Sequence, residues 1–220
     1  EIADLRCSEI KSQQLVQFAK SLKVLPQTRA NYLSHLAAIF RVARPLWGYP
    51  LDLQQIEDAM IAMRKLGTIS KVNSRSRRPT LEELDRLMTH FKQAQAHRPR
   101  SAPMTKIAAF ALFSTRRQEE ITRITWDDYD KNAGRVWVRD MKNPGDMKGN
   151  HVSCELPPKA PAIIDSMPRV ASQIFPYTTD AISAAFTRAC RHLQISDLRF
   201  HDLRNEGVSR LFEMGKRLRI

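Results

Sequence analysis

Two short segments carry residues whose types and spacing suit chemistry on a phosphodiester. In the first, an arginine pair, Arg116 and Arg117, follows an apolar run, and Glu120 lies three residues after Arg117, close enough on a helix to orient it. In the second, His201 and Arg204 are three residues apart and share one face of a predicted helix. Because the arginine fork binds two phosphate oxygens at once, these segments predict stabilisation of phosphate charge without a metal ion.

A metal site is the competing hypothesis. Asp127, Asp128 and Asp130 place three carboxylates within four residues, which suits a hard cation. An acidic turn between a helix and a strand is the better interpretation, since no second acidic or histidine cluster supports a two-metal site. The remaining histidines show no ligand spacing: His35, His90, His97, His151 and His192. We therefore predict neither a metal nor a cofactor.

The charge of the chain indicates an anionic partner. In 220 residues, 36 Lys and Arg stand against 23 Asp and Glu, which gives a net charge of +13 and a pI of about 10.1. Double-stranded DNA is the first candidate. A membrane partner is not expected, because the longest apolar stretch, Ile107–Phe113, is far shorter than the roughly 18 residues of a spanning helix.

Cysteine usage and the absence of targeting motifs predict a reducing compartment. Cys7, Cys154 and Cys190 are odd in number and widely spaced, which disfavours both a disulfide framework and a thiolate metal site. Neither a signal peptide nor a lipidation motif is found, so we expect a cytoplasmic, nucleoid-associated protein.

Helical periodicity dominates the amino-terminal third of the chain. Apolar residues recur at helical spacing in three stretches, which are Ser8–Leu22, a helix starting near Thr28, and Leu53–Leu66. The second and third are separated by the breakers Pro45, Gly48 and Pro50. We predict a helical DNA-binding domain over residues 1–72, a basic linker over 73–79 and a second domain over 80–220.

The second domain is predicted to mix helices with a small antiparallel sheet. Thr80 and Glu83 form a capping box, ahead of a helix with an apolar face beginning at Leu81. The other predicted elements are a helix over Met104–Phe113, a β-hairpin with strands Arg135–Arg139 and His151–Leu156, a helix from Asp180 and a last helix over His201–Gly215.

The order of these motifs resembles the catalytic domain of the tyrosine recombinases, the phage-integrase family. Arg117-x-x-Glu120 follows an apolar helix, a lysine-bearing hairpin comes next, and His201-x-x-Arg204 opens a late helix. Three further segments resemble the family's integrases: Thr28-x-x-x-Tyr32, Arg77-Arg78-Pro79-Thr80-x-x-Glu83, and Phe175–Arg204 with its Phe186 and Arg188. The resemblance implies a mainly α protein, with a helical core-binding (SAM-like) domain and an α/β catalytic domain that close as a C-shaped clamp on duplex DNA.

The resemblance also implies roles for individual residues. Arg117 and Arg204 would clamp the scissile phosphate, His201 would contact the phosphate or accept the nucleophile's proton, and Glu120 would support Arg117. Lys142, at the end of the first hairpin strand, would protonate the leaving 5′ oxygen. Two alternatives stay open, Arg116 in place of Arg117 and Lys148 in place of Lys142. The spacing to Glu120 favours Arg117, and the strand end favours Lys142.

The chain departs from the family pattern at two points. The family cleaves DNA with a tyrosine beyond the His-x-x-Arg helix, whereas Tyr32, Tyr49, Tyr129 and Tyr177 all precede it here. Asn205 stands where the family very often has His. We expect a recombinase fragment that lacks its nucleophile and binds DNA without cleaving it. The alternatives are a catalytically inactive DNA-binding relative and an architectural DNA-binding protein.

DNA contacts are expected from the amino-terminal helices and the linker. The candidates are Arg29, Asn31, Arg41, Arg44, Lys71, Arg75, Arg77 and Arg78, mostly for phosphates. By resemblance, the full-length protein would assemble as a tetramer on DNA.

Overall fold

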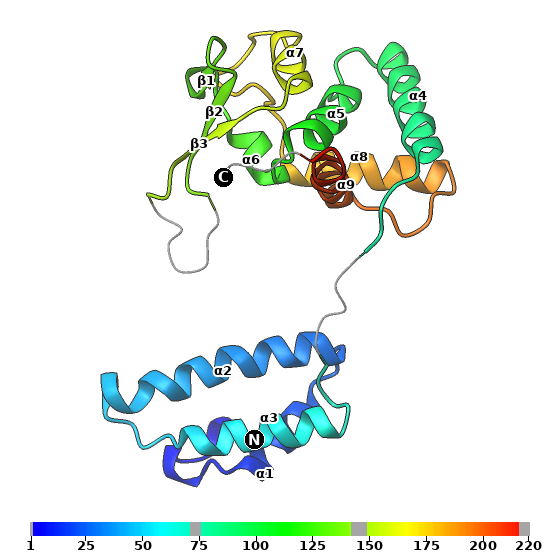
Figure 1. The fold of residues 1–220 in the computed structure, drawn as a ribbon. Helices are drawn as coiled ribbons and strands as arrows, with labels where there is room; N and C mark the ends of the chain where they lie inside the picture. The colour runs from blue at the N-terminus through cyan, green and yellow to red at the C-terminus, as the bar shows by residue number, and fades with distance from the viewer. Residues whose placement is uncertain (1, 71–75, 142–148, 216–220) are drawn as a thin grey trace. The chain divides into compact units, whose positions relative to one another are not determined.

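The chain forms two compact units, residues 1–75 and 76–220, each with its own hydrophobic core (Figure 1). The computed structural model describes residues 2–70, 76–141 and 149–215. We call the two parts the first unit and the second unit. The predicted fold class is confirmed, since the protein is mainly helical with a small antiparallel sheet.

The first unit is entirely helical in its described part. Two 3-10 turns, Ile2–Asp4 and Cys7–Glu9, precede α1 (Ser12–Ser21), α2 (Pro26–Trp47) and α3 (Leu53–Lys65). Its core is built from the apolar faces of these helices, with Leu15, Leu33, Ile56 and Met63 fully buried. The periodicity therefore located this core correctly.

Helix α2 differs from its prediction at both ends. It begins at Pro26, whose missing N–H costs nothing at the first helical position. It also continues through Pro45, which the sequence predicts to be a breaker, and runs to Trp47 with Gly48 as its C-cap. Gly48 has a φ of +70°, and the amide of the next residue, Tyr49, donates to the carbonyl of Ala43, so a left-handed cap closes the helix.

The second unit places helices on both sides of a central helix. Its elements are α4 (Leu81–His97), α5 (Met104–Ser114), α6 (Gln118–Arg123), the 3-10 turn Trp126–Asp128, β1 (Tyr129–Asp130), β2 (Arg135–Val138), β3 (Val152–Glu155), α7 (Lys159–Asp165), α8 (Thr179–His192) and α9 (Phe200–Glu213). Figure 1 shows the sheet and α7 at one end of the unit, and α4 and α8 at the other. Helix α5 packs against α4, α7, α8 and α9, which explains why almost all of its apolar run is buried.

The capping box and the hairpin are confirmed in detail. The Glu83 amide donates to Thr80 Oγ1 at 3.1 Å, and the Thr80 amide donates to the Glu83 carboxylate at 2.8 Å. Strands β2 and β3 pair antiparallel with Val136 opposite Cys154. The structure adds β1, which pairs with β2 and is too short to show an alternating pattern. Leu81, expected on the buried face of α4, is 71% exposed because it lies in the first turn, before the helix meets its neighbours.

Candidate functional site

The turn between α5 and α6 positions the first predicted arginine. Helix α5 ends at Thr115, a buried residue with a left-handed φ of 56° that only the surrounding packing can hold. Arg117 is the residue before α6, and Glu120 lies in the first turn of that helix. The buried Glu120 carboxylate accepts hydrogen bonds from the Arg117 amide at 3.0 Å and from its Nη1 at 2.9 Å. Glu120 therefore orients Arg117, as the spacing predicted.

Helix α9 brings the second predicted arginine to the same turn. Arg204 Nε donates to the carbonyl oxygen of Thr115 at 2.7 Å. Burial, and then the neighbouring Arg117 cation, lower the pKa of Arg204. Because a guanidinium stays charged in proteins, two cations are held together here at an electrostatic cost that a bound anion would offset.

His201 lies one turn before Arg204 on α9 and keeps an exposed surface. Partial burial, followed by the Arg204 and Arg117 cations, lowers the pKa of His201, while Asp202 opposes the shift. The shift favours the neutral imidazole, which can both donate and accept a proton.

A close helix contact sets the position of α9. Gly207 packs directly on the end of α5, where a Cβ on this residue would lie 1.9 Å from the carbonyl oxygen of Leu112. Only glycine allows this approach. Gly207 lies one turn beyond Arg204 on α9. The close contact at Gly207 therefore fixes where Arg204 lies relative to the carbonyl oxygen of Thr115.

The two neighbouring arginines point to different partners. Arg116 Nε donates to the Ser114 carbonyl at 3.2 Å, and its Nη1 donates to Cys154 Sγ on β3 at 3.0 Å. Arg117 Nη1 instead donates to the buried Glu120 carboxylate at 2.9 Å. Both cations lower the pKa of Arg204, Arg117 more than Arg116. Arg116 therefore links the turn to the sheet, whereas Arg117 is oriented by the carboxylate that its spacing predicts.

Lys142 and its alternative Lys148 lie outside the described residues. The residues on either side of that segment are paired, because the Met141 amide donates to the Asn150 carbonyl at 2.8 Å and Asn150 Nδ2 donates back to the Met141 carbonyl at 3.0 Å. The pairing of the two chain segments thus continues beyond β2 and β3 as far as Met141 and Asn150.

The candidate DNA contacts fall into three groups. Lys71 and Arg75 lie outside the described residues. Asn31, Arg41 and Arg44 are exposed on α2. The remaining three are hydrogen-bonded within the protein: Arg29 to the carbonyls of Leu22, Val24 and Thr68, Arg77 to Glu83, and Arg78 to Glu206 and Glu213.

Sequence reasoning missed the ion pairs around Glu206 on α9. This carboxylate is 3% exposed, and it accepts from Arg78 Nε at 2.6 Å and from Arg210 Nε at 2.5 Å. Burial raises the pKa of Glu206, but the two arginine hydrogen bonds outweigh burial and lower it overall. Only the i,i+4 spacing of Glu206 and Arg210 was visible in the sequence, since Arg78 is remote along the chain.

In the acidic turn that contains Asp127, Asp128 and Asp130, Asp128 stabilises the fold. Asp128 is buried, accepts from Thr125 Oγ1 at 2.6 Å and pairs with Arg139 Nε at 2.8 Å. Over residues 2–70, 76–141 and 149–215, no group of three or more His, Cys, Asp or Glu side chains is placed to hold a metal ion. Within these same ranges, no helix has the length and apolar character of a membrane span.

The family model and the curated relative that match this chain both indicate a DNA recombinase family. Residues 77–220 match the model of the phage integrase family. The Shufflon-specific DNA recombinase of Escherichia coli is 31% identical over 189 residues, which cover 83% of this chain and 43% of that protein. The chain thus spans less than half of the length of this relative.

Solved structures share the fold. The Tn1549 transposon integrase in complex with transposon right end DNA matches with a TM-score of 0.67 at 14% identity, over 97% of this chain and 76% of that one. A lambda integrase dimer bound to a COC′ core site matches with a TM-score of 0.58 at 15% identity, over 97% and 77%. With the family model covering most of the chain and the curated relative above 30% identity, this protein belongs to the phage integrase family.

Proposed function

We propose that this chain is the DNA-binding and phosphate-activating part of a tyrosine-type site-specific recombinase. The observation that carries the proposal is the meeting of Arg117 and Arg204 at the Thr115 turn, with His201 one helical turn away. Arg117 and Arg204 come from segments of the second unit that are far apart in sequence. In a member of the phage integrase family, such a cluster of cations suits a scissile phosphate of DNA.

The proposed reaction needs no external energy source. A tyrosine oxygen attacks the phosphorus and forms a 3′-phosphotyrosyl bond, while the bond from phosphorus to the 5′ oxygen breaks. Arg117 and Arg204 neutralise the charge that builds up on the non-bridging oxygens. His201 accepts the tyrosine proton or binds the phosphate, and Lys142 gives a proton to the departing 5′ oxygen. The reverse attack by a new 5′ hydroxyl rejoins the strand.

The proposal places the nucleophilic tyrosine in protein sequence outside residues 1–220. Burial raises the pKa of Tyr177, and burial followed by the carboxylate of Asp165 raises the pKa of Tyr129. Both rings pack against the hydrophobic core of the second unit, so we assign neither residue this role. The length of the curated relative, of which this chain spans 43%, leaves ample room for a further segment.

DNA contacts in this proposal come from the first unit and the segment that follows it. The exposed Asn31, Arg41 and Arg44 on α2 are the described candidates, with Lys71 and Arg75 beyond them. Arg29, Arg77 and Arg78 already satisfy protein acceptors, so we assign them to holding the fold. Assembly as a tetramer on DNA belongs to the same proposal, by analogy with a lambda integrase tetramer bound to a Holliday junction, which matches with a TM-score of 0.50.

The test uses the full-length protein that contains this chain and a nicked suicide duplex, from which a cleaved strand cannot be rejoined. We expect a covalent protein–DNA adduct that migrates as a single band on a denaturing gel. Arg117→Ala and Arg204→Ala should each slow its formation by about a hundredfold or more. Arg191→Ala on exposed α8 removes the same charge away from the site and should leave the rate unchanged. An adduct that forms equally fast in both arginine variants contradicts the proposal.

A DNA-binding relative that does not cut is the second candidate. Asn205 follows Arg204 directly, where the resemblance calls for His, and an amide cannot act as a proton donor and acceptor in the way imidazole does. This candidate predicts tight binding of the duplex and no adduct from the full-length protein. The same gel, run beside a binding assay, separates the two functions.

A further inference from the structure

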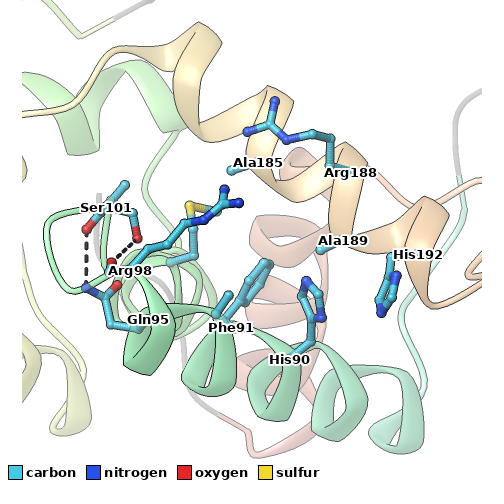
Figure 2. A pocket seen from close by; sticks show the side chains of 12 residues that line it. His90, Phe91, Gln95, Arg98, Ser101, Ala185, Arg188, Ala189 and His192 are labelled. Atoms are coloured by element: carbon cyan, nitrogen blue, oxygen red, sulfur yellow. Dashed lines mark hydrogen bonds between the residues drawn. The ribbon is translucent and has the colours of Figure 1, made fainter.

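A pocket of about 330 Å³ lies between α4 and α8 of the second unit, and no residue of the recombinase site lines it. Figure 2 shows the side chains of Arg98 and Arg188 toward its Ala185 side, and the rings of His90 and His192 toward its other side. The four side chains come from α4, the loop that follows it, and α8. The pocket is therefore built by elements that are separate in sequence.

The charge of the lining is entirely of one sign. Among the described residues that form the pocket, none is acidic. Elsewhere in this unit arginines have carboxylate partners, as Arg77 has Glu83 and Arg210 has Glu206. Within the part of the chain that the structure describes, the guanidinium groups of Arg98 and Arg188 take part in no ion pair. Two guanidinium groups without an ion-pair partner beside one pocket favour the binding of an oxyanion there.

The loop that carries Arg98 is held by its own hydrogen bonds. Gln95 Nε2 donates to the carbonyls of Pro99 at 2.8 Å and Ser101 at 3.3 Å, and Ser101 Oγ donates to the Arg98 carbonyl at 2.7 Å (Figure 2). Phe91, Met104 and Ala189 supply a buried apolar part of the lining. An anion would thus rest on an apolar base, with the exposed arginine side chains at the mouth of the pocket.

The two imidazoles repel each other when both are charged. Their ring centroids lie 4.9 Å apart. Burial, and then His192, lower the pKa of His90. The other charged groups near this ring are Asp85 and Arg86 on α4, Arg188 on α8, and Arg98 in the loop after α4. Arg86 is engaged with the Leu193 carbonyl. An anion bound in the pocket beside His90 would oppose this lowering of its pKa and favour its protonation.

We propose that this pocket binds a phosphate group, with Arg98 and Arg188 as the clamp and His90 and His192 as additional donors. The phosphate comes either from a free phosphate ester or from DNA. The site is independent of the proposed strand-transfer chemistry, because it shares no residue with the Arg117 and Arg204 cluster.

The first experiment titrates residues 1–220 with sulfate, a phosphate mimic whose charge does not change near neutral pH, at constant ionic strength. Binding is followed by calorimetry and by the NMR signals of the imidazoles. Arg98→Ala and Arg188→Ala should each weaken binding about tenfold or more. The matched controls Arg100→Ala and Arg191→Ala remove neighbouring exposed charges that do not line the pocket, and they should bind as the unchanged chain does. Equal losses in all four variants would show nonspecific attraction and overturn the proposal.

The second experiment repeats the sulfate titration at about pH 7.5 and about pH 5.5. Affinity should rise at the lower pH, because protonation of His90 adds a donor and a positive charge to the lining. His90→Ala should flatten this dependence. An affinity that is the same at both pH values in the unchanged chain contradicts the role of the histidines.

The source of the phosphate is decided by duplex DNA. If the group belongs to DNA, Arg98→Ala and Arg188→Ala should weaken duplex binding and each reduce the slope of log affinity against log salt by about one. If it belongs to a free ester, both variants should bind DNA normally while losing sulfate. Either result supports the proposal that the pocket binds a phosphate group. If Arg98→Ala and Arg188→Ala both bind sulfate as well as the unchanged chain does, the proposal is wrong.

Discussion

Two buried carboxylates, Glu120 and Glu206, orient three arginine side chains of the second unit. Glu120 binds the side chain and amide of Arg117, and Glu206 joins Arg78 to Arg210. A buried carboxylate with charged donors is favourable only as long as those donors remain, since an unpaired buried charge costs several kcal/mol. Each pair is therefore a point at which one substitution disturbs a larger part of the unit.

Removal of the Glu206 charge should destabilise the protein in a pH-dependent way. We expect Glu206→Gln to lower the free energy of unfolding by about 1–3 kcal/mol at pH 7, less than for a fully buried pair because Arg78 is 42% exposed. The folded pKa of Glu206 lies below its ordinary value of 4.5, so this contribution is complete above about pH 5 and is lost as the pH falls through the lowered pKa. The difference between the two proteins should therefore shrink in acid, as measured by urea unfolding at several pH values.

Glu213→Gln is the control, because Glu213 pairs with the same Arg78 but is 58% exposed. It should change stability by less than about 0.5 kcal/mol and should not alter the pH dependence. A Glu206→Gln variant as stable as the unchanged chain at pH 7 would refute the importance of this pair.

At the scale of elements, the contact between α5 and α9 decides the site. Helix α5 is the buried centre of the unit and ends at the Thr115 turn that carries Arg117. Helix α9 carries His201 and Arg204 and reaches the same turn because Gly207 lets the two backbones approach. Neither helix could form the site alone.

Gly207→Ala should therefore damage both stability and function. The new methyl group would meet the Leu112 carbonyl at 1.9 Å, so α9 must move away. We expect a loss of about 2–4 kcal/mol in urea unfolding. As a consequence of the proposed function, adduct formation by the full-length protein should also fall. Ser209→Ala on the same helix is the control and should be nearly neutral. A Gly207→Ala variant with unchanged stability would mean that α9 tolerates a different packing.

At the scale of the whole molecule, two separate hydrophobic cores and a large positive net charge are the features that bear on DNA binding. The first unit buries its own residues around Leu33 and Ile56, and the second buries a separate set around Phe110 and Phe175. Two independent cores allow each unit to carry its own part of a nucleic-acid surface. The net charge of +13 attracts the chain to a polyanion such as DNA.

Duplex binding by residues 1–220 should depend strongly on salt. If DNA is the partner, each neutralised phosphate releases condensed counterions, so the affinity should fall about a hundredfold or more between about 50 and 200 mM salt. Fluorescence anisotropy with a labelled duplex measures this slope. A flat dependence would contradict duplex DNA as the partner.

Local patterns predicted the elements of this protein well. The Thr80–Glu83 box, the apolar run of α5 and the alternation in β2 each depend on residues close in sequence, and all three are present in the structure. The order of Arg117-x-x-Glu120 and His201-x-x-Arg204 was also sufficient to indicate the family. Failures occurred where the local signal was short or ambiguous, as with the two-residue β1 and with Pro45 inside α2.

The tertiary structure alone decided how the functional residues meet. Sequence spacing left Arg116 and Arg117 as alternatives, and in the fold Arg116 contacts Cys154 whereas Arg117 contacts Glu120. The ion pair of Arg78 with Glu206 likewise joins remote segments. Periodicity and capping depend on neighbours within a few residues, whereas these contacts depend on how closely α9 packs on α5. That distance is set by the absence of a side chain at Gly207, whose effect only the packed structure reveals.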